Sequence, residues 1–259
     1  MDLFNLNPQN ILSFFLTFFR ISIVLFLLPF FGGQGLPRTV KAALCLVLTL
    51  GLWPSLSFDP SLFPGHPLGI LLMILGELLL GLSIGLIVNF LFAAIQTGGQ
   101  LIGFQMGFAI VNVVDPMTGV SEAVTAHFMY MISLLIFLSL NGHLYLLSGM
   151  AQSFELVPPG GFLVTPVLMD KMISFSAMIF LLAVKIAAPV TATVILVDIA
   201  LALVARATPQ MNVLFVGMPV RIIVGFVFLA MLFKLMTVYI TDYVTDLDSM
   251  FLQVLKAGS

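Results

Sequence analysis

The sequence predicts an all-α integral membrane protein. Of its 259 residues, 61% are apolar and only 8% are charged, whereas an ordinary soluble domain has about 25% charged residues. The mean hydropathy is +1.22. A soluble protein of this length could not hide so much apolar surface from water. Much of the chain must therefore contact lipid or other apolar protein.

Six stretches are apolar enough to enter a membrane, and we expect each to be helical. They are 11–31, 40–56, 68–95, 124–140, 172–204 and 213–240. A spanning helix needs about 20 apolar residues, within a range of about 17–25, so the second and fourth stretches are at the short limit. The fifth is too long for one straight span. It contains Pro189, which removes a backbone donor, so we expect this helix to be kinked or split.

The longest polar connections are expected at 57–67, 96–123 and 141–171. The third contains the run Pro158-Pro159-Gly160-Gly161, a strong break. We place a structural division there, inside one membrane-embedded domain that covers the whole chain. Residues 1–157 then hold four apolar helices. Residues 162–259 form a long helical hairpin that turns near 206–212.

The basic residues give a weak indication of orientation. With six crossings, the loops near Arg38 and Arg206 lie on one side of the membrane, and both termini lie on the other. The first side has more basic residues close to helix ends, and such loops tend to be cytoplasmic. We therefore expect the hairpin turn to be cytoplasmic and both termini to face outward.

The central segment 98–116 reads GGQLIGFQMGFAIVNVVDP. Gly99, Gly103 and Gly107 recur every four residues, which places them on one helix face and allows another backbone to approach closely. Each glycine costs about 1 kcal/mol relative to alanine in a helix. Close packing, or a backbone that leaves the helix, must offset that cost.

Two interpretations of this segment stay open. One is a tight helix–helix contact with no further role. The other is a constriction in a pore, because Phe104, Met106 and Phe108 are bulky and apolar, and methionine is flexible. Such side chains would seal against small ions yet yield to a passing chain. The spacing alone does not choose between the two.

Five charged residues lie inside apolar runs: Arg20, Glu77, Lys185, Asp198 and Arg221. Such residues usually face a neighbour, a cavity or water, and often pair. Glu77 with either Arg20 or Arg221 would form a pair between helices. Lys185 and Asp198 are 13 residues apart, about 20 Å along one helix, and cannot pair directly. We expect all five to be assembly charges; the alternative, a proton or ion relay, would need several carboxylates along one face.

Catalysis, cofactors and nucleic acid have little support. The histidines His66, His127 and His143 are scattered, and neither an HExxH nor a CxxC pattern occurs to indicate a metal site. The sequence contains no recognisable nucleophile–base pair or phosphate-binding loop, and no basic cluster indicates nucleic acid. Cys45 is the only cysteine, so an internal disulfide is impossible. We expect a protein that is not an enzyme and that needs no cofactor.

Three motifs carry a resemblance to a known family. They are GFQMGFAIVNVVDP at 103–116, NGHLYLL at 141–147 and ATPQMNVLFVGMPVRIIVG at 207–225. Together they resemble the FliR/SctT family, whose members are export-gate subunits of type III secretion systems in bacterial flagella and injectisomes. The resemblance spans essentially the whole chain, and it favours the flagellar system.

The resemblance implies more than the residues show. Members look like a fusion of FliP-like and FliQ-like subunits, which matches the division near 158–161. One such chain would join copies of both partners, and an FlhB-like switch subunit, in the bacterial inner membrane at the flagellar basal body. Unfolded proteins would pass through the channel of this assembly. Much of such a gate lies above the bilayer plane, so the apolar runs need not all cross lipid.

The resemblance also implies roles for particular residues. The pore constriction or plug would comprise Phe104, Met106, Phe108, Val111 and Met117. The cytoplasmic hairpin turn, with Arg206, Pro209, Gln210 and Asn212, would dock other export components.

The alternative function is a secondary transporter or ion channel with a polar site at the membrane midplane. A third class, an intramembrane enzyme, would need converging polar residues that the sequence does not show.

Overall fold

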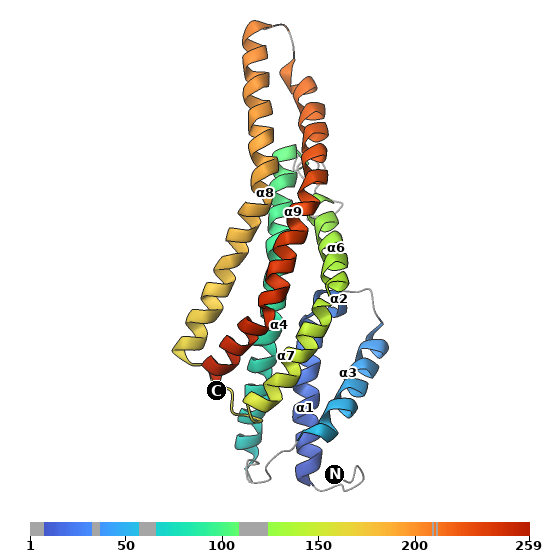
Figure 1. Ribbon diagram of the computed structural model, residues 1–259, viewed down its shortest axis with the longest axis vertical. Helices are drawn as coiled ribbons and strands as arrows, with labels where there is room; N and C mark the ends of the chain where they lie inside the picture. Colours follow the sequence, from blue (N-terminus) through green and yellow to red (C-terminus); the bar gives the residue numbers. More distant parts are fainter. Residues whose placement is uncertain (1–7, 33–36, 57–65, 109–123, 209, 211) are drawn as a thin grey trace. The chain divides into compact units, whose positions relative to one another are not determined.

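The computed structural model describes residues 8–32, 37–56, 66–108, 124–208, 210 and 212–259 (Figure 1). These residues form helices and no strands, which confirms the all-α prediction. The helices are α1 (Pro8–Leu27), α2 (Pro29–Gly32), α3 (Arg38–Leu52), α4 (Pro67–Met106), α6 (Val124–Ser139), α7 (Gly142–Leu156), α8 (Pro166–Ala207) and α9 (Val213–Gly258), with a short 3₁₀ helix η1 (Trp53–Ser55).

The prediction of about six spans was slightly too high. In the part of the chain that is described, four helices are long and apolar enough to cross a membrane, namely α1, α4, α8 and α9. A fifth crossing is present if α6 and α7 count as one bent span. Helix α3 has 15 residues and α6 has 16, fewer than the 17–25 that a span needs. The orientation argument from six crossings therefore loses its basis.

Several helices extend beyond the apolar runs. Residues 96–106 were expected in a polar connection but belong to α4, and 142–156 form α7.

Helix α8 is not split at Pro189, although proline removes one helical hydrogen bond. Val190 and Val194 just beyond the proline are completely buried. Packing of this helix face outweighs the local cost. The hairpin turn between Ala207 and Val213 is where it was predicted.

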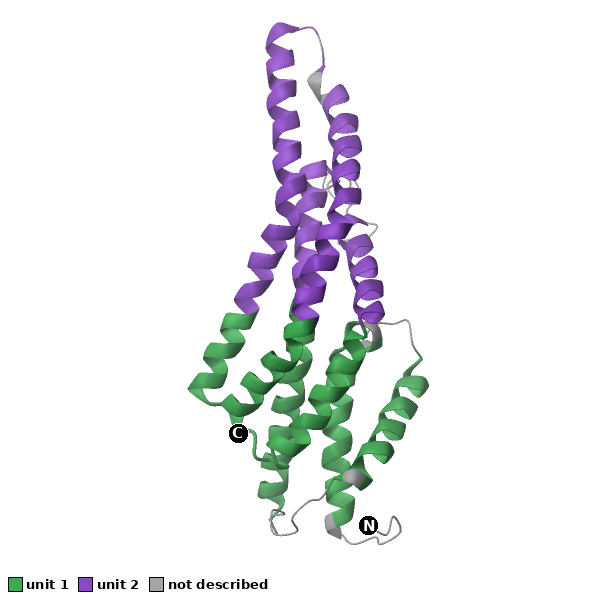
Figure 2. Ribbon diagram, viewed as in Figure 1, with its two compact units in different colours: residues 1–90, 141–175, 245–259 green, residues 91–140, 176–244 purple. Residues whose placement is uncertain are grey.

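The chain forms two compact units (Figure 2). Unit 1 contains residues 1–90, 141–175 and 245–259, and unit 2 contains 91–140 and 176–244. Helices α4, α8 and α9 each contribute one part to each unit. Residues 158–161, where we predicted a division, lie between α7 and α8, inside unit 1. Whether it separates FliP-like and FliQ-like parts stays a prediction.

In unit 1, α1 packs closely on α4. A Cβ atom added to Gly81 would lie 3.0 Å from the Ile23 side chain, and one added to Gly85 would lie 2.6 Å from that of Leu27. The Asn89 amide donates a hydrogen bond to the Leu27 carbonyl. Small residues every four positions thus bring two helices into contact, as they do in membrane helix pairs. Helix α3 also packs on α1. Trp53 of η1, which follows α3, donates from Nε1 to Ser13 Oγ of α1 at 3.0 Å.

In unit 2, α6 and the end of α4 pack together through aromatic rings. Phe92 is 98% buried, and its ring meets those of Tyr130 and Phe137 edge to face at 5.8 and 5.4 Å. Helices α8 and α9 run antiparallel on either side of the turn. A Cβ at Gly217 of α9 would lie 3.3 Å from Leu201 of α8. This contact fixes which residues of the hairpin lie at the same height.

Candidate functional site

Charged residues of unit 1 meet in a buried cluster. Arg20 of α1 is completely buried, and Glu77 of α4 is 1% exposed. Arg20 Nε donates to Glu77 Oε2 at 2.5 Å, and Arg20 Nη2 donates to Oε1 at 2.8 Å. This is a two-pronged guanidinium–carboxylate pair, the geometry that arginine and glutamate form best. Of the two pairings left open for Glu77, the structure has the one with Arg20.

Backbone groups complete the Arg20–Glu77 cluster. Arg20 Nη1 donates to the carbonyl of Ser153 at 2.9 Å, and Nη2 donates to that of Val157 at 3.3 Å. The backbone N–H of Gly160 donates to Glu77 Oε1 at 3.2 Å. The guanidinium also lies over the Phe154 ring, 4.2 Å from its centroid, in a cation–π contact. One ion pair thus ties α1 and α4 to the end of α7 and the turn after it.

Gly160 is required by the backbone at this point. Its φ is +74°, a left-handed conformation that side chains rarely adopt. A Cβ there would also lie 2.6 Å from the Met73 side chain. The glycine in the Pro-Pro-Gly-Gly run therefore lets the chain turn back close to α4 and present its N–H to Glu77. Sequence reasoning assigned this run only the role of a break.

Unit 2 holds a second ion pair, between α8 and α9. Arg221 Nε lies 2.5 Å from Asp198 Oδ1, and the two side chains are 38% and 32% exposed. This pair accounts for two of the five charges in apolar runs. Lys185 lies on the same helix as Asp198, on an exposed part of α8. As expected from their spacing, Lys185 and Asp198 do not pair with each other.

The glycine-rich end of α4 packs tightly inside unit 2. A Cβ at Gly99 would lie 2.6 Å from the Cα of Ala126 in α6, and one at Gly98 would lie 3.1 Å from the carbonyl oxygen of Ala183 in α8. Thr125 Oγ1 donates to the Gly99 carbonyl at 2.8 Å. The α4 backbone is therefore in direct contact with a second backbone at Gly99. Gly103 is buried.

Gly107 differs from Gly99. Its φ is +92°, and a Cβ there would have nothing within 4 Å. Within this chain, Gly107 ends the helix rather than admitting a neighbour. Its N–H donates to the Phe104 carbonyl at 3.1 Å, and the Phe108 N–H donates to the Gly103 carbonyl at 3.0 Å. These bonds close the last turn of α4.

The bulky residues of this segment point in different directions. Phe104 is 57% exposed, whereas Met106 is completely buried. Met106 packs against α9, since a Cβ at Gly225 would lie 2.6 Å from its Cγ. The half-buried Phe108 meets Phe226 of α9 edge to face at 6.1 Å. Val111 and Met117, also expected at the constriction, lie outside the described residues.

The hairpin turn is an exposed, polar end of unit 2. Arg206, Gln210 and Asn212 are exposed. The Asn212 carbonyl accepts a hydrogen bond from the Phe215 N–H at 3.2 Å at the start of α9. Pro209 lies outside the described residues. The role of this turn in docking other export components stays a prediction.

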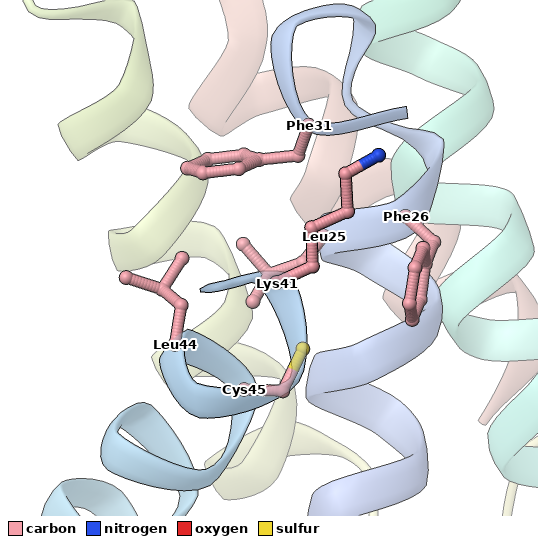
Figure 3. A pocket seen from close by; sticks show the side chains of 6 residues that line it. All are labelled: Leu25, Phe26, Phe31, Lys41, Leu44 and Cys45. Atoms are coloured by element: carbon pink, nitrogen blue, oxygen red, sulfur yellow. The ribbon is translucent and has the colours of Figure 1, made fainter. Parts of the chain in front are cut away.

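Among the described residues, no group of three or more His, Cys, Asp or Glu side chains lies close enough to hold a metal ion. A small pocket between α1 and α3 is shown in Figure 3. It is barely large enough for one water molecule. It is lined by Leu25, Phe26, Phe31, Lys41, Leu44 and Cys45.

The fold and these sites define an all-α, multi-pass membrane protein in which the buried charges Arg20 and Glu77 form a pair between two helices. Its sequence from residue 11 to 247 matches the family model of the bacterial export proteins, family 1. The chain belongs to this family.

Curated relatives cover almost the whole chain. It is 38% identical over 224 residues to the flagellar biosynthetic protein FliR of Bacillus subtilis, which covers 84% of each chain. The FliR of Aquifex aeolicus is 32% identical over 95% of this chain and 94% of its own. The FliR of Escherichia coli is 27% identical over 94% of this chain and 92% of its own. The resemblance drawn from the three motifs is therefore confirmed.

Proposed function

We propose that this protein is a membrane subunit of the flagellar type III export gate. With FliP-like and FliQ-like partner subunits it would form the channel in the bacterial inner membrane through which unfolded flagellar proteins are exported. It would act as a structural subunit and not as an enzyme. The family and the names of its relatives support the assignment to flagellar export.

The length of the exposed apolar face of α8 is the observation that indicates protein partners. This helix has 42 residues, about 63 Å at 1.5 Å per residue. Val167 near its start is 58% exposed, and Leu203 near its end is 63% exposed. These two residues are about 54 Å apart along the helix, but the hydrocarbon core is only about 30 Å thick. Lipid cannot cover both ends, so protein partners would cover part of this face.

The proposed constriction uses the end of α4. Phe104 is mostly exposed, and Phe108 lies at the point where the helix ends at Gly107. These rings would face the channel, continued by Val111 and Met117. Met106 would hold the segment in place, because its side chain is buried against α9. The two ion pairs, Arg20–Glu77 and Asp198–Arg221, would keep the helices in register during assembly.

Copurification tests the proposal. A tagged chain extracted in mild detergent should carry two smaller apolar proteins with it in a stable complex. A tagged, unrelated multi-pass protein from the same cells serves as the control. If the chain elutes alone and moves a small solute when reconstituted alone in vesicles, the secondary-transporter alternative replaces this proposal.

A further inference from the structure

Two lysines lie at the same height on the α8–α9 hairpin of unit 2. The two helices run antiparallel on either side of the turn (Figure 2). The Asp198–Arg221 ion pair fixes their register. Lys185 lies 13 residues before Asp198, and Lys234 lies 13 residues after Arg221. Both are therefore about 20 Å from that pair, on the side away from the turn. Both are exposed, and within the described part of the chain neither has an ion-pair partner.

Polar residues of the other two helices of unit 2 lie at this height too. The contacts of Gly98 with Ala183 and of Gly99 with Ala126 bring α4, α6 and α8 together here. Phe128 of α6 meets Phe233 of α9 edge to face at 5.9 Å. The neighbouring residues Gln96 and Gln100 of α4 and His127 of α6 are polar. We call this level of unit 2, which holds Gln96, Gln100, His127, Lys185 and Lys234, the polar layer.

The hairpin between this polar layer and the turn has the length of a membrane span. Segments 186–207 and 213–233 are about 33 and 32 Å long at 1.5 Å per residue, close to the 30 Å of the hydrocarbon core. Their only charges are the paired Asp198 and Arg221, and Arg206 beside the turn. Their outer faces are strongly apolar: Leu196, Leu203, Phe215, Ile223 and Met231 are 63–78% exposed.

The rest of α9 has a different character. Residues 235–258 carry Asp242, Asp246, Asp248 and Lys256. Asp242 and Asp246 are exposed. Exposed carboxylates are costly in contact with hydrocarbon. This part of α9 is therefore a poor lipid-facing surface, and the apolar residues of α8 beside it need a different cover.

We propose that segments 186–207 and 213–233, here called the hairpin belt, contact the hydrocarbon of the bilayer. Lys185 and Lys234 bind the phosphate groups of lipid headgroups at one boundary, and Arg206 lies at the other. A lysine buries its aliphatic stem along an apolar surface while its ammonium reaches the headgroups. The assembly partner expected for Lys185 is thus a lipid phosphate. The inference requires only that the chain is a multi-pass membrane protein, so its failure leaves the export proposal intact.

Spin labels measure the position of the hairpin belt. In the full-length chain with Cys45→Ala, single cysteines replace Leu196 or Ile223 in the belt. Phe180 and Val238, exposed residues on the other side of the polar layer, are the matched controls. The labelled assembly is reconstituted in phosphatidylethanolamine–phosphatidylglycerol vesicles, and collision with oxygen and with a water-soluble nickel chelate is recorded.

The proposal expects Leu196 and Ile223 labels to collide with oxygen but not with nickel, and to be deeper than the Phe180 and Val238 labels. Two results would overturn it. One is the greatest depth at Phe180 and Val238. The other is an immobile label at Leu196 and Ile223 that neither reagent reaches, because a protein partner would then cover the belt.

A second experiment tests the lysines directly. Phosphatidylglycerol retained by the detergent-extracted assembly is measured by native mass spectrometry. The double variant Lys185→Gln, Lys234→Gln should retain at most half of the lipid, whereas the arginine double variant and Lys256→Gln should match the parent. Unchanged retention in the glutamine variant, or a carboxyl–amine cross-link from either lysine to a partner protein, would overturn the lipid assignment.

Discussion

Glu77 accepts two hydrogen bonds from Arg20, a residue 57 positions earlier in the chain, at 2.5 and 2.8 Å. Both side chains are removed from water. The desolvation of two buried charges offsets much of their attraction, so the pair adds less to stability than its geometry suggests. The pair links α1 and α4 to the end of α7, because Arg20 also donates to the carbonyls of Ser153 and Val157.

Removing one partner of this pair should therefore be severe. We expect Glu77→Leu to lower the free energy of unfolding by about 3–5 kcal/mol, since Arg20 is left buried without a counter-charge. The double variant Arg20→Met, Glu77→Leu should recover part of the loss. Thermal unfolding of the detergent-extracted protein measures both. Glu155→Gln, on an exposed side chain of α7, is the control. A loss in the double variant equal to the sum of the Arg20→Met and Glu77→Leu losses would show that the charges are not coupled.

The Asp198–Arg221 pair should respond differently, because its side chains are about one third exposed. We expect Asp198→Ala and Arg221→Ala each to reduce the amount of assembled complex modestly. The exchange Asp198→Arg, Arg221→Asp should restore it, because the two residues face each other across the hairpin. Complex yield after size-exclusion chromatography is the measurement. A charge exchange that is worse than both single variants would mean that each residue has a separate partner.

Gly99 should tolerate no side chain. A Cβ there would lie 2.6 Å from the backbone of Ala126, which cannot move as a side-chain tip can. We expect Gly99→Ala to destabilise the protein by about 1–3 kcal/mol through overpacking. Gly51→Ala in α3 is the matched control, because nothing lies within 4 Å of its Cβ position. There the gain in helix propensity, about 1 kcal/mol, should stabilise. The same sign of change at both positions would contradict the close contact.

Different substitutions at the end of α4 should affect gating and stability separately. Phe104→Ala together with Phe108→Ala should make the closed gate leak ions while the protein stays folded, because Phe104 is mostly exposed. Met106→Ala should instead lower stability by about 2–5 kcal/mol, since its side chain is buried. Membrane conductance and unfolding temperature are read in parallel. Leu101→Ala, exposed on the same helix, is the control for conductance. An unchanged conductance in the double phenylalanine variant would remove these rings from the constriction.

The side of the hairpin turn can be read by labelling. In the Cys45→Ala chain, a cysteine in place of the exposed Thr208 should react with an impermeant thiol reagent only after the inner membrane is opened. Arg206 beside it provides the basic bias that favours the cytoplasm. Reaction from the periplasmic side of intact spheroplasts would reverse this orientation.

The sequence alone determined the class of protein, the helical hairpin and the family. Composition is enough to predict the class of protein, because a chain of this size with only 8% charged residues cannot cover its apolar surface in water. The predictions of a turn near 206–212 and of a break at Pro158–Gly161 follow from local backbone chemistry, and three motifs indicated the family. Each of these features is encoded within a short window or in the overall composition.

Only the tertiary structure decided what depends on packing between distant segments. It paired Glu77 with Arg20 and Asp198 with Arg221, choices that depend on which helix faces meet. It kept α8 continuous through Pro189 and extended α4 to Met106, because buried contacts outweigh the local cost of proline and glycine. It also turned Met106 inward while Phe104, two residues earlier, stays exposed. The local sequence determines the free-energy cost of each backbone conformation. Contacts with distant segments of the chain determine whether that cost is offset.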